Sequence, residues 1–157
     1  DVGYLMTVSP FLDQIKSVED LFDPSDYGFS NSYPAGSIAA AGGVLTAGSD
    51  APVDTREPRP FFNLEKAVTR QQDETGRVYN PAEKISLADA LDAYTINGAK
   101  MLQNDQISGS LEAGKKADFV ILDTDLLALE AAGNAHQISA TQVLSTWFDG
   151  RKIYGAD

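Results

Sequence analysis

The sequence predicts an α/β fold, and the first half of the chain carries that prediction. Residues 43–47 form an apolar run without clean alternation, which is typical of a short strand covered on both faces. Residues 2–8 predict an earlier strand, and small residues at 37–41 predict a helix between the two. A strand, a helix and a strand in that order indicate a parallel βαβ unit.

A loop and a helix are expected next. Residues 54–59 are rich in charged residues and proline, which favours a loop, and Pro60 fits the first position of a helix. Phe61, Leu64 and Val68 then lie at helical spacing on one face.

A further helix is expected to begin at Ser86. Ser86 and Asp89 form a capping-box-like pair, and apolar residues follow at helical spacing. We expect Asn97 and Gly98 to interrupt this helix, because an Asn-Gly pair favours a turn. Residues 99–102 can form another turn or short helix.

The last third of the chain has the pattern of a β structure. Residues 119–122 and 143–148 predict two strands, and residues 126–136 between them predict a short helix or loop. The pair Asp149-Gly150 separates 143–148 from another apolar run. An Asp-Gly pair in that position is a strong signal for a two-residue β-hairpin, because both central residues need positive φ.

Composition limits the function. The chain has 157 residues, 43% of them hydrophobic, which is enough for a globular core. Its net charge of -11 disfavours nucleic acid and anionic membranes as partners. It has no cysteine, so thiolate metal sites and cysteine nucleophiles are excluded. No apolar run approaches the ~18 residues of a membrane helix. The first residues already look like a strand within a fold, so we expect the true N-terminus to lie upstream.

Asp50 is the leading catalytic candidate. It follows the 43–47 strand in a Gly/Pro-rich loop, and the carboxyl ends of parallel strands are where α/β barrels hold their active sites. The alternative is a loop aspartate that accepts backbone N–H bonds or caps the next helix. The pattern alone does not decide between the two.

Other polar residues have simpler interpretations. His136 is the single histidine, too few for a catalytic zinc site, so we interpret it as a surface or loop residue. Lys115 and Lys116 lack the spacing of a phosphate-binding loop and predict a solvated turn. Arg70 is expected to be a solvent-facing, ion-pairing helix residue; the alternative is a loop anchor near the site.

Three segments together resemble a known family. They are GGVLTAGSDAPV at 42–53, GSLEAGKKADFVILD at 109–123 and TWFDGRKIY at 146–154. In this order and spacing the chain resembles the C-terminal portion of a metal-dependent amidohydrolase, of the family-3 branch that includes N-substituted formamide deformylases.

The resemblance implies a fold and a reaction. Residues 1–108 would be the last strand-helix units of a TIM-type (β/α)8 barrel, and residues 109–157 would be strands of an accessory β-sandwich. The rest of the barrel would come from a missing N-terminal segment or a partner chain. The implied reaction is hydrolysis of a C–N bond in a small amide-type molecule, with a divalent metal, zinc by expectation. Asp50 would contact the metal and shuttle a proton, while the family's histidines and lysine have no counterpart here.

Two points about binding remain predictions. The loop at 11–33 could form a wall of the pocket, with Phe11 and Tyr33 as the chosen substrate-binding residues and Phe22 and Tyr27 as further candidates. The alternatives to an enzyme are a non-catalytic α/β binding or structural subunit and a degenerate amidohydrolase scaffold. The sequence does not decide whether the protein forms a homo-oligomer.

Overall fold

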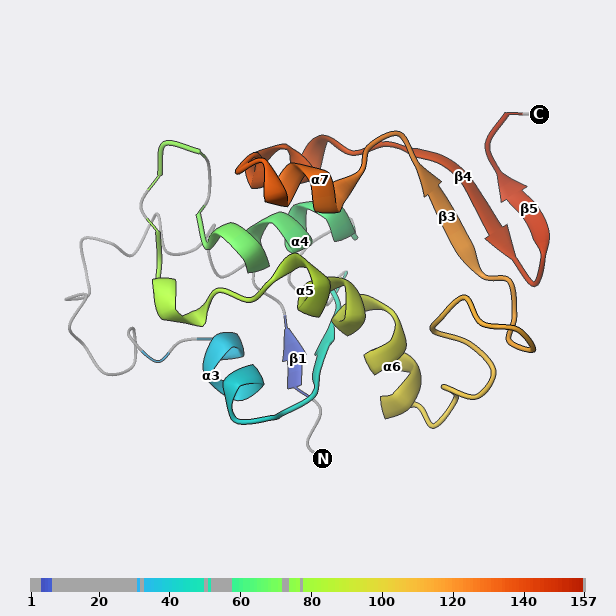
Figure 1. Cartoon of the computed structure of the whole chain (residues 1–157), viewed down its shortest axis with the longest axis horizontal. Helices are drawn as coiled ribbons and strands as arrows, with labels where there is room; N and C mark the ends of the chain where they lie inside the picture. Colours follow the sequence, from blue (N-terminus) through green and yellow to red (C-terminus); the bar gives the residue numbers. More distant parts are fainter. Residues whose placement is uncertain are drawn as a thin grey trace.

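The fold is seen in a computed structural model. It describes residues 4–6, 31, 33–49, 51, 58–71, 74–76 and 78–156. Figure 1 shows these residues as a group of helices beside a short parallel strand pair, with a separate antiparallel sheet toward the C-terminus.

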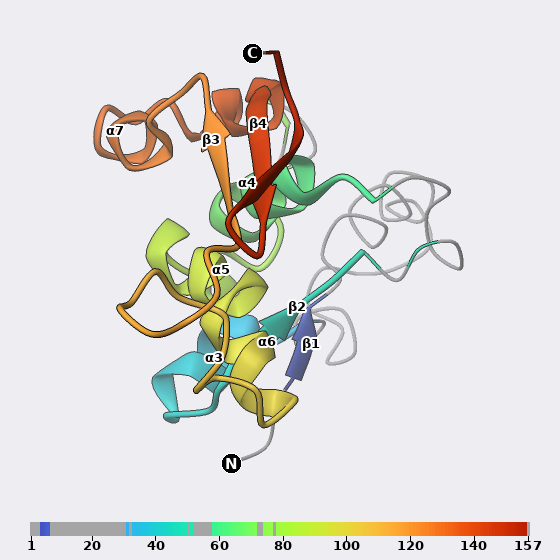
Figure 2. The same cartoon turned by 90° about the vertical axis from the view of Figure 1, so that its right-hand side faces the viewer.

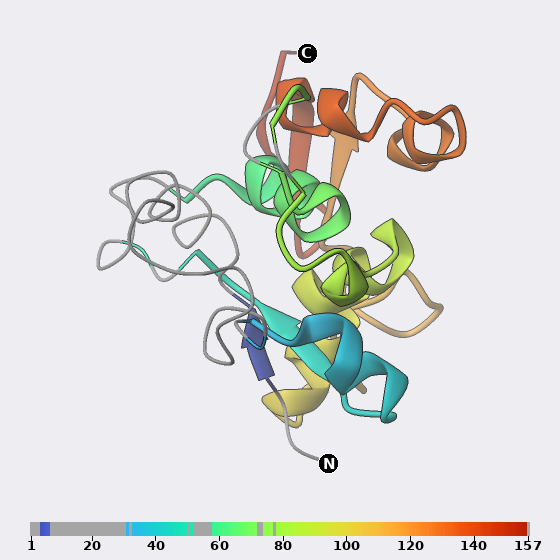
Figure 3. The same cartoon turned by 90° about the vertical axis from the view of Figure 1, so that its left-hand side faces the viewer.

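The parallel βαβ unit predicted from the sequence is confirmed. Strand β1 (Tyr4–Met6) pairs in parallel with β2 (Leu45–Ala47), and α3 (Ala35–Ala40) lies between them in the chain. Met6 lies opposite Ala47, so the two strands end at the same edge. Helices α3 and α5 (Leu87–Tyr94) lie on the same side of this pair (Figure 2 and Figure 3).

Helix α3 touches the 3-10 helix η1 (Pro81–Glu83) very closely. A Cβ on Gly36 would lie 2.5 Å from the carbonyl oxygen of Ala82, so only glycine fits at this contact. The carboxylate of Glu83 accepts hydrogen bonds from the backbone N–H of Ser37, at 2.8 Å, and from its hydroxyl. This satisfies a backbone donor in the first turn of α3 that has no partner inside the helix.

The two predicted helix starts are confirmed. Helix α4 (Pro60–Thr69) begins at Pro60. Helix α5 begins after Ser86, whose hydroxyl oxygen accepts the N–H of Asp89 at 3.1 Å. Helix α4 packs against α5 and against η2 (Ala135–Ala140), while α5 packs against β2.

The predicted interruption at Asn97 and Gly98 is wrong. Both residues lie inside α6 (Ile96–Met101), and the break falls at Thr95, with φ -127° and ψ -98°. The Thr95 hydroxyl donates to the carbonyl of Leu91 at 2.7 Å, in the last turn of α5. A glycine inside a helix costs only about 1 kcal/mol relative to alanine. Packing of α6 on β2 outweighs that preference.

The hydrophobic core lies between β2 and the helices. Its buried members come from elements far apart in the sequence, and they include Leu45, Leu64, Leu87, Leu126 and Ile138. Leu126 belongs to α7 (Leu126–Ala131) and Ile138 to η2, so the β3–β4 connection helps to close the core. The short helix expected within 126–136 is thereby confirmed.

The C-terminal sheet has the order β3 (Phe119–Leu122), β4 (Val143–Phe148), β5 (Arg151–Tyr154), all antiparallel. The predicted hairpin is present, with φ of 50° at Asp149 and 74° at Gly150. The rings of Phe119 and Trp147 stack on one face with centroids 5.5 Å apart.

The other face of this sheet carries an exposed apolar stripe. Val120 lies opposite Thr146, which lies opposite Tyr154, so their side chains share a face with Leu144 and Phe148. The apolar stripe is Val120, Leu144, Phe148 and Tyr154, exposed to 48%, 54%, 56% and 60%. Among the described helices, none combines the length and the apolar character needed to cross a membrane.

Candidate functional site

The candidate site is the edge where the parallel strands end. Strand β2 leads directly into Gly48, Ser49 and then Asp50. Asp50, the predicted catalytic and metal-binding residue, lies outside the described residues, and so does Phe11. Ser49 and Ala51 on either side are described, and the Ser49 hydroxyl oxygen accepts the N–H of Ala51 at 3.3 Å.

Strand β2 packs against helices α5 and α6. Leu45 belongs to the core, and the side chain of Thr46 is buried with its hydroxyl 3.7 Å from the sulfur of Met101 in α6. Since both contacts lie on β2 itself, the point at which the strand ends is fixed by the packing of α5 and α6.

Tyr33, a predicted substrate-binding residue, lies just before α3 and is half-buried. Its φ is 51°, and its carbonyl accepts the N–H of Ala35 at 2.8 Å. In a βαβ unit, the segment before the helix lies at the edge where the first strand ends. Tyr33 therefore belongs to the same edge as Ser49, and whether its ring meets a substrate stays a prediction.

Arg70 does not face solvent as expected, because its exposed fraction is 0%. It follows the last residue of α4 in a left-handed conformation, and its Nε donates to the carbonyl of Tyr79 at 3.1 Å. The Tyr79 N–H donates back to the Arg70 carbonyl at 2.9 Å. One guanidinium nitrogen also donates to the carbonyl of Tyr33 at 3.4 Å. Arg70 is thus the loop anchor that the sequence left as the alternative.

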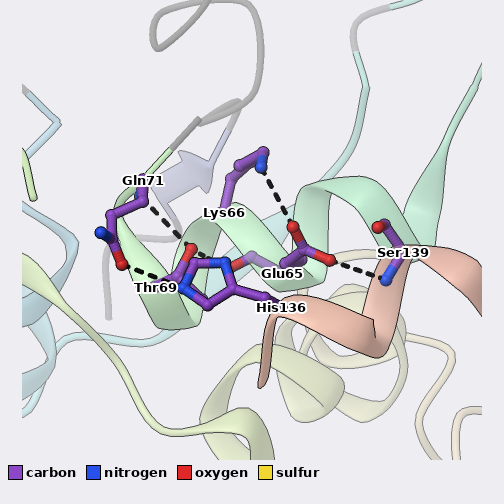
Figure 4. A network of polar contacts seen from close by, with 6 residues as sticks. All are labelled: Glu65, Lys66, Thr69, Gln71, His136 and Ser139. Atoms are coloured by element: carbon purple, nitrogen blue, oxygen red, sulfur yellow. Dashed lines mark hydrogen bonds and ion pairs between the residues drawn. The ribbon is translucent and has the colours of Figure 1, made fainter. Parts of the chain in front are cut away.

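A buried ion pair lies where α4 meets η2 (Figure 4). The ammonium of Lys66 is 3.1 Å from one carboxylate oxygen of Glu65, and the other oxygen accepts the N–H of Ser139 at 2.9 Å. The Lys66 ammonium also lies 4.6 Å from the centre of the Phe62 ring, a cation–π contact. The ion pair lies within α4, and the hydrogen bond from Ser139 to Glu65 joins η2 to α4.

His136 lies at the same interface (Figure 4). It is half-buried in η2, so the prediction of a surface or loop position is wrong: the packing of η2 on α4 covers it. Its Nε2 is 3.0 Å from the side-chain oxygen of Gln71. Its Nδ1 is buried and has no hydrogen-bond partner among the residues described here. His136 contacts the end of α4 and is part of that interface.

The described residues do not form a metal site by themselves. Within them, no three histidine, aspartate or glutamate side chains gather closely enough to hold an ion. A catalytic zinc usually takes three protein ligands rich in histidine, and the whole chain has 1 histidine.

A groove of about 600 Å³ opens beside the C-terminal end of α5. It lies between α6, the segment after it and β3, and its lining includes Tyr94, Asn104, Ser108, Leu111 and Asp118. The phenol of Tyr94 accepts a hydrogen bond from the Asn63 amide at 3.0 Å, but burial dominates and raises its pKa. Because α5 runs back from the strand ends, this groove is distinct from the candidate site.

Comparison with known proteins identifies the family. The sequence model of the Amidohydrolase family matches residues 13–154. The chain therefore belongs to this family, as the resemblance of the three sequence segments predicts.

Two curated relatives are similar over most of the chain. Protein LONG AFTER FAR-RED 3 from Arabidopsis thaliana is 35% identical over 130 residues, which make up 83% of this chain and 21% of the plant protein. The N-substituted formamide deformylase from Arthrobacter pascens is 34% identical over 118 residues, 75% of this chain and 20% of that protein. The chain thus spans about a fifth of the length of these relatives.

The fold is also shared with solved structures. An adenosine deaminase from Xanthomonas campestris with bound zinc matches with a TM-score of 0.60 at 22% identity, over 98% of this chain and 32% of that one. The arrangement of helices and strands described above is therefore also found within that deaminase.

Proposed function

We propose that this chain is the C-terminal part of a metal-dependent hydrolase that cleaves carbon–nitrogen bonds of amide type. One observation carries the proposal: a parallel β1–α3–β2 unit, in a member of the Amidohydrolase family, ends in Gly48, Ser49 and Asp50. Active sites of α/β barrels lie at the carboxyl ends of their strands, which is where Asp50 follows in the sequence.

Asp50 would act as the proton-transfer group. Its carboxylate would accept a proton from the attacking water and return it to the leaving nitrogen, so that the nitrogen departs as a neutral amine. A carboxylate can do both steps if it stays within hydrogen-bond reach of the water and of the nitrogen. The fixed position of β2 would hold Asp50 in place for both.

The metal would be held mainly by residues outside this chain. A divalent ion, zinc by preference, supplies a water of lowered pKa when it is bound. Asp50 is the one ligand that we assign to these 157 residues. The zinc-bound adenosine deaminase with the same fold supports a metal in the whole protein.

The substrate would be a small molecule bound over the strand ends. The name of the Arthrobacter relative points to N-substituted formamides as a first class to test. Tyr33 and Phe11 would contribute to the pocket wall. For Tyr33, its position at the edge where the strands end supports this role.

The domain boundary is proposed at residue 108. Residues 1–108 would be the last strand-helix units of the barrel, and residues 109–157 would be strands of an accessory β-sandwich. The apolar stripe supports the second part, because exposed apolar faces of this kind usually pack against another layer. We propose that the covering strands and the remaining barrel belong to an N-terminal segment or a partner chain outside these 157 residues.

A second candidate is a non-catalytic scaffold. The observation that favours it is that the described residues hold no metal-binding cluster and the chain has 1 histidine. A degenerate amidohydrolase would keep the β1–α3–β2 unit and lose hydrolysis.

The test uses the full-length protein. We expect transition metal to co-purify with it, and Asp50→Asn to lower the rate of formate release from an N-substituted formamide by about 10²- to 10⁴-fold. Asp92→Asn, an exposed aspartate on α5, is the matched control and should leave the rate unchanged. Full activity of Asp50→Asn, or an intact protein without metal and without hydrolysis, would favour the scaffold instead.

A further inference from the structure

Two polar links join the segments that follow β1 and β2. In the first, the Arg70 guanidinium at the end of α4 donates to the carbonyl of Tyr33. In the second, the Glu83 carboxylate of η1 accepts the N–H of Ser37. Tyr33 and Ser37 flank the start of α3, while Arg70 and Glu83 belong to the connection between β2 and α5. We call these four residues the clasp.

The backbone conformation at Arg70 is unfavourable for arginine, which indicates that contacts of its side chain stabilise it. Its φ of 57° lies in the left-handed region, where glycine and asparagine are favoured and other residues cost roughly 1 kcal/mol or more. Burying a guanidinium adds a desolvation cost. An arginine at this position is therefore held by what its side chain binds, namely the carbonyls of Tyr79 and Tyr33.

We propose that Arg70 is a positioning residue for the candidate active site. The proposal rests on the hydrolase function proposed above. Arg70 fixes the Tyr33 segment relative to α4, at the edge of the fold where β2 ends. Because its side chain is fully buried, we assign it no direct contact with substrate, and it acts through the backbone of Tyr33. Glu83 fixes the same segment four residues later, at Ser37.

The variant Arg70→Gly tests the effect of the side chain apart from that of the backbone conformation. Glycine tolerates the left-handed conformation, so the variant removes the guanidinium without adding strain. In the full-length protein we expect KM for an N-substituted formamide to rise between about 10- and 100-fold, since small misplacements of binding groups have effects of that size. The kcat and the zinc content should change much less, because Asp50 is untouched.

Chemical rescue gives a readout that a general loss of structure would not. Free guanidinium at millimolar concentration should lower the raised KM of Arg70→Gly most of the way to that of the unmodified protein. It should not change the KM of the unmodified protein. Arg70→Lys keeps the charge but has one nitrogen where two carbonyls are bound, so we expect an intermediate KM. Arg151→Gly, at an exposed position on β5, is the control for a lost arginine.

Hydrogen exchange tests the clasp without any activity. In Arg70→Gly the amides of Ala35 and Tyr79 should exchange faster, because their acceptors are the carbonyls of Tyr33 and Arg70. Unchanged exchange and unchanged KM would overturn the proposal. If the unmodified protein hydrolyses no formamide, the proposed function fails. Hydrogen exchange then still tests whether Arg70 fixes the Tyr33 segment. If Arg70→Gly does not fold, Arg70→Lys carries the same two measurements.

Discussion

At the scale of single residues, the clasp includes residues with an unfavourable backbone conformation. Among the described non-glycine residues, positive φ occurs at Tyr33, Arg70, Asn80, Gln103 and Asp149. Two of these belong to the clasp, and Asn80 directly follows Tyr79. Such conformations persist where surrounding contacts determine them. Contacts between segments distant in the sequence therefore fix the backbone at this edge of the fold.

Asp123 provides a prediction for pH. Its carboxylate accepts the backbone N–H of Gln142 at 2.9 Å and the hydroxyl of Thr124 at 2.8 Å, and these bonds lower its pKa. A carboxyl group whose pKa is lower in the folded state stabilises the fold above its unfolded pKa of ~3.9. That stabilisation is lost as the pH falls through the folded pKa.

Asp123→Asn should therefore lower the urea midpoint at pH 7. The difference from the unmodified protein should shrink below about pH 4, as the carboxyl group becomes protonated in both states. Asp105→Asn, for which we assign no such role, serves as the control. A difference that is the same at pH 7 and pH 3 would contradict this account.

Sequence reasoning at this scale succeeded where the cause is local. The Asp149-Gly150 turn was predictable because its two residues supply the positive φ themselves. Arg70 was not, because its burial depends on Tyr33 and Tyr79, which no pattern around Arg70 reveals. His136 was misplaced for the same reason, since α4 covers it.

At the scale of elements, the Glu65–Lys66 pair should decide how firmly η2 is held. Glu65→Ala removes the acceptor of Ser139 N–H and the carboxylate beside a buried ammonium. Breaking a buried ion pair from one side costs about 3 to 5 kcal/mol. We expect a loss of that order in the free energy of unfolding, measured by denaturation of the full-length protein.

Two variants control this prediction. Glu74→Ala, at an exposed position, should change the free energy of unfolding by less than about 0.5 kcal/mol. The double variant Glu65→Leu with Lys66→Met should recover much of the loss, because apolar replacement of a whole buried pair is often neutral. A loss below about 1 kcal/mol for Glu65→Ala would mean that the pair adds little.

The helix starts were predictable and one helix end was not. Pro60 and the Ser86–Asp89 pair act within their own first turns, so sequence alone located α4 and α5. The break at Thr95 was missed because Asn97 and Gly98 look like stronger breakers. The burial of Glu65 and Lys66 was also missed, since a Glu-Lys pair in a helix normally faces water.

At the scale of the molecule, the apolar stripe yields a prediction about the strands that we propose cover it. If strands outside these 157 residues cover it, Leu144→Lys should destabilise the full-length protein by about 2 kcal/mol or more, because it would bury a charge in an apolar interface. Leu127→Lys, at an exposed leucine on α7 away from the stripe, should be close to neutral. Equal and small effects of the two changes would mean that the stripe faces water.

The family could be read from the sequence, but the complete site could not. The order and spacing of three segments were enough to predict the Amidohydrolase family. The chain spans about a fifth of its curated relatives, so its residues do not reveal most of the proposed pocket or the further ligands of the proposed metal. Asp50 itself is still a prediction from its place after β2.

The parallel pairing of β1 with β2 also sets an order of folding. Strand β5 pairs with β4 across a two-residue turn, and hairpins of this kind form within about 1 to 10 μs. Strand β1 must instead wait for Leu45, far along the chain, so its partner comes only after a large loop closes. During synthesis β1 precedes β2, with chain growth at about 5 to 20 residues per second. Of the described strands, β1 therefore waits longest for the strand with which it pairs in this structure.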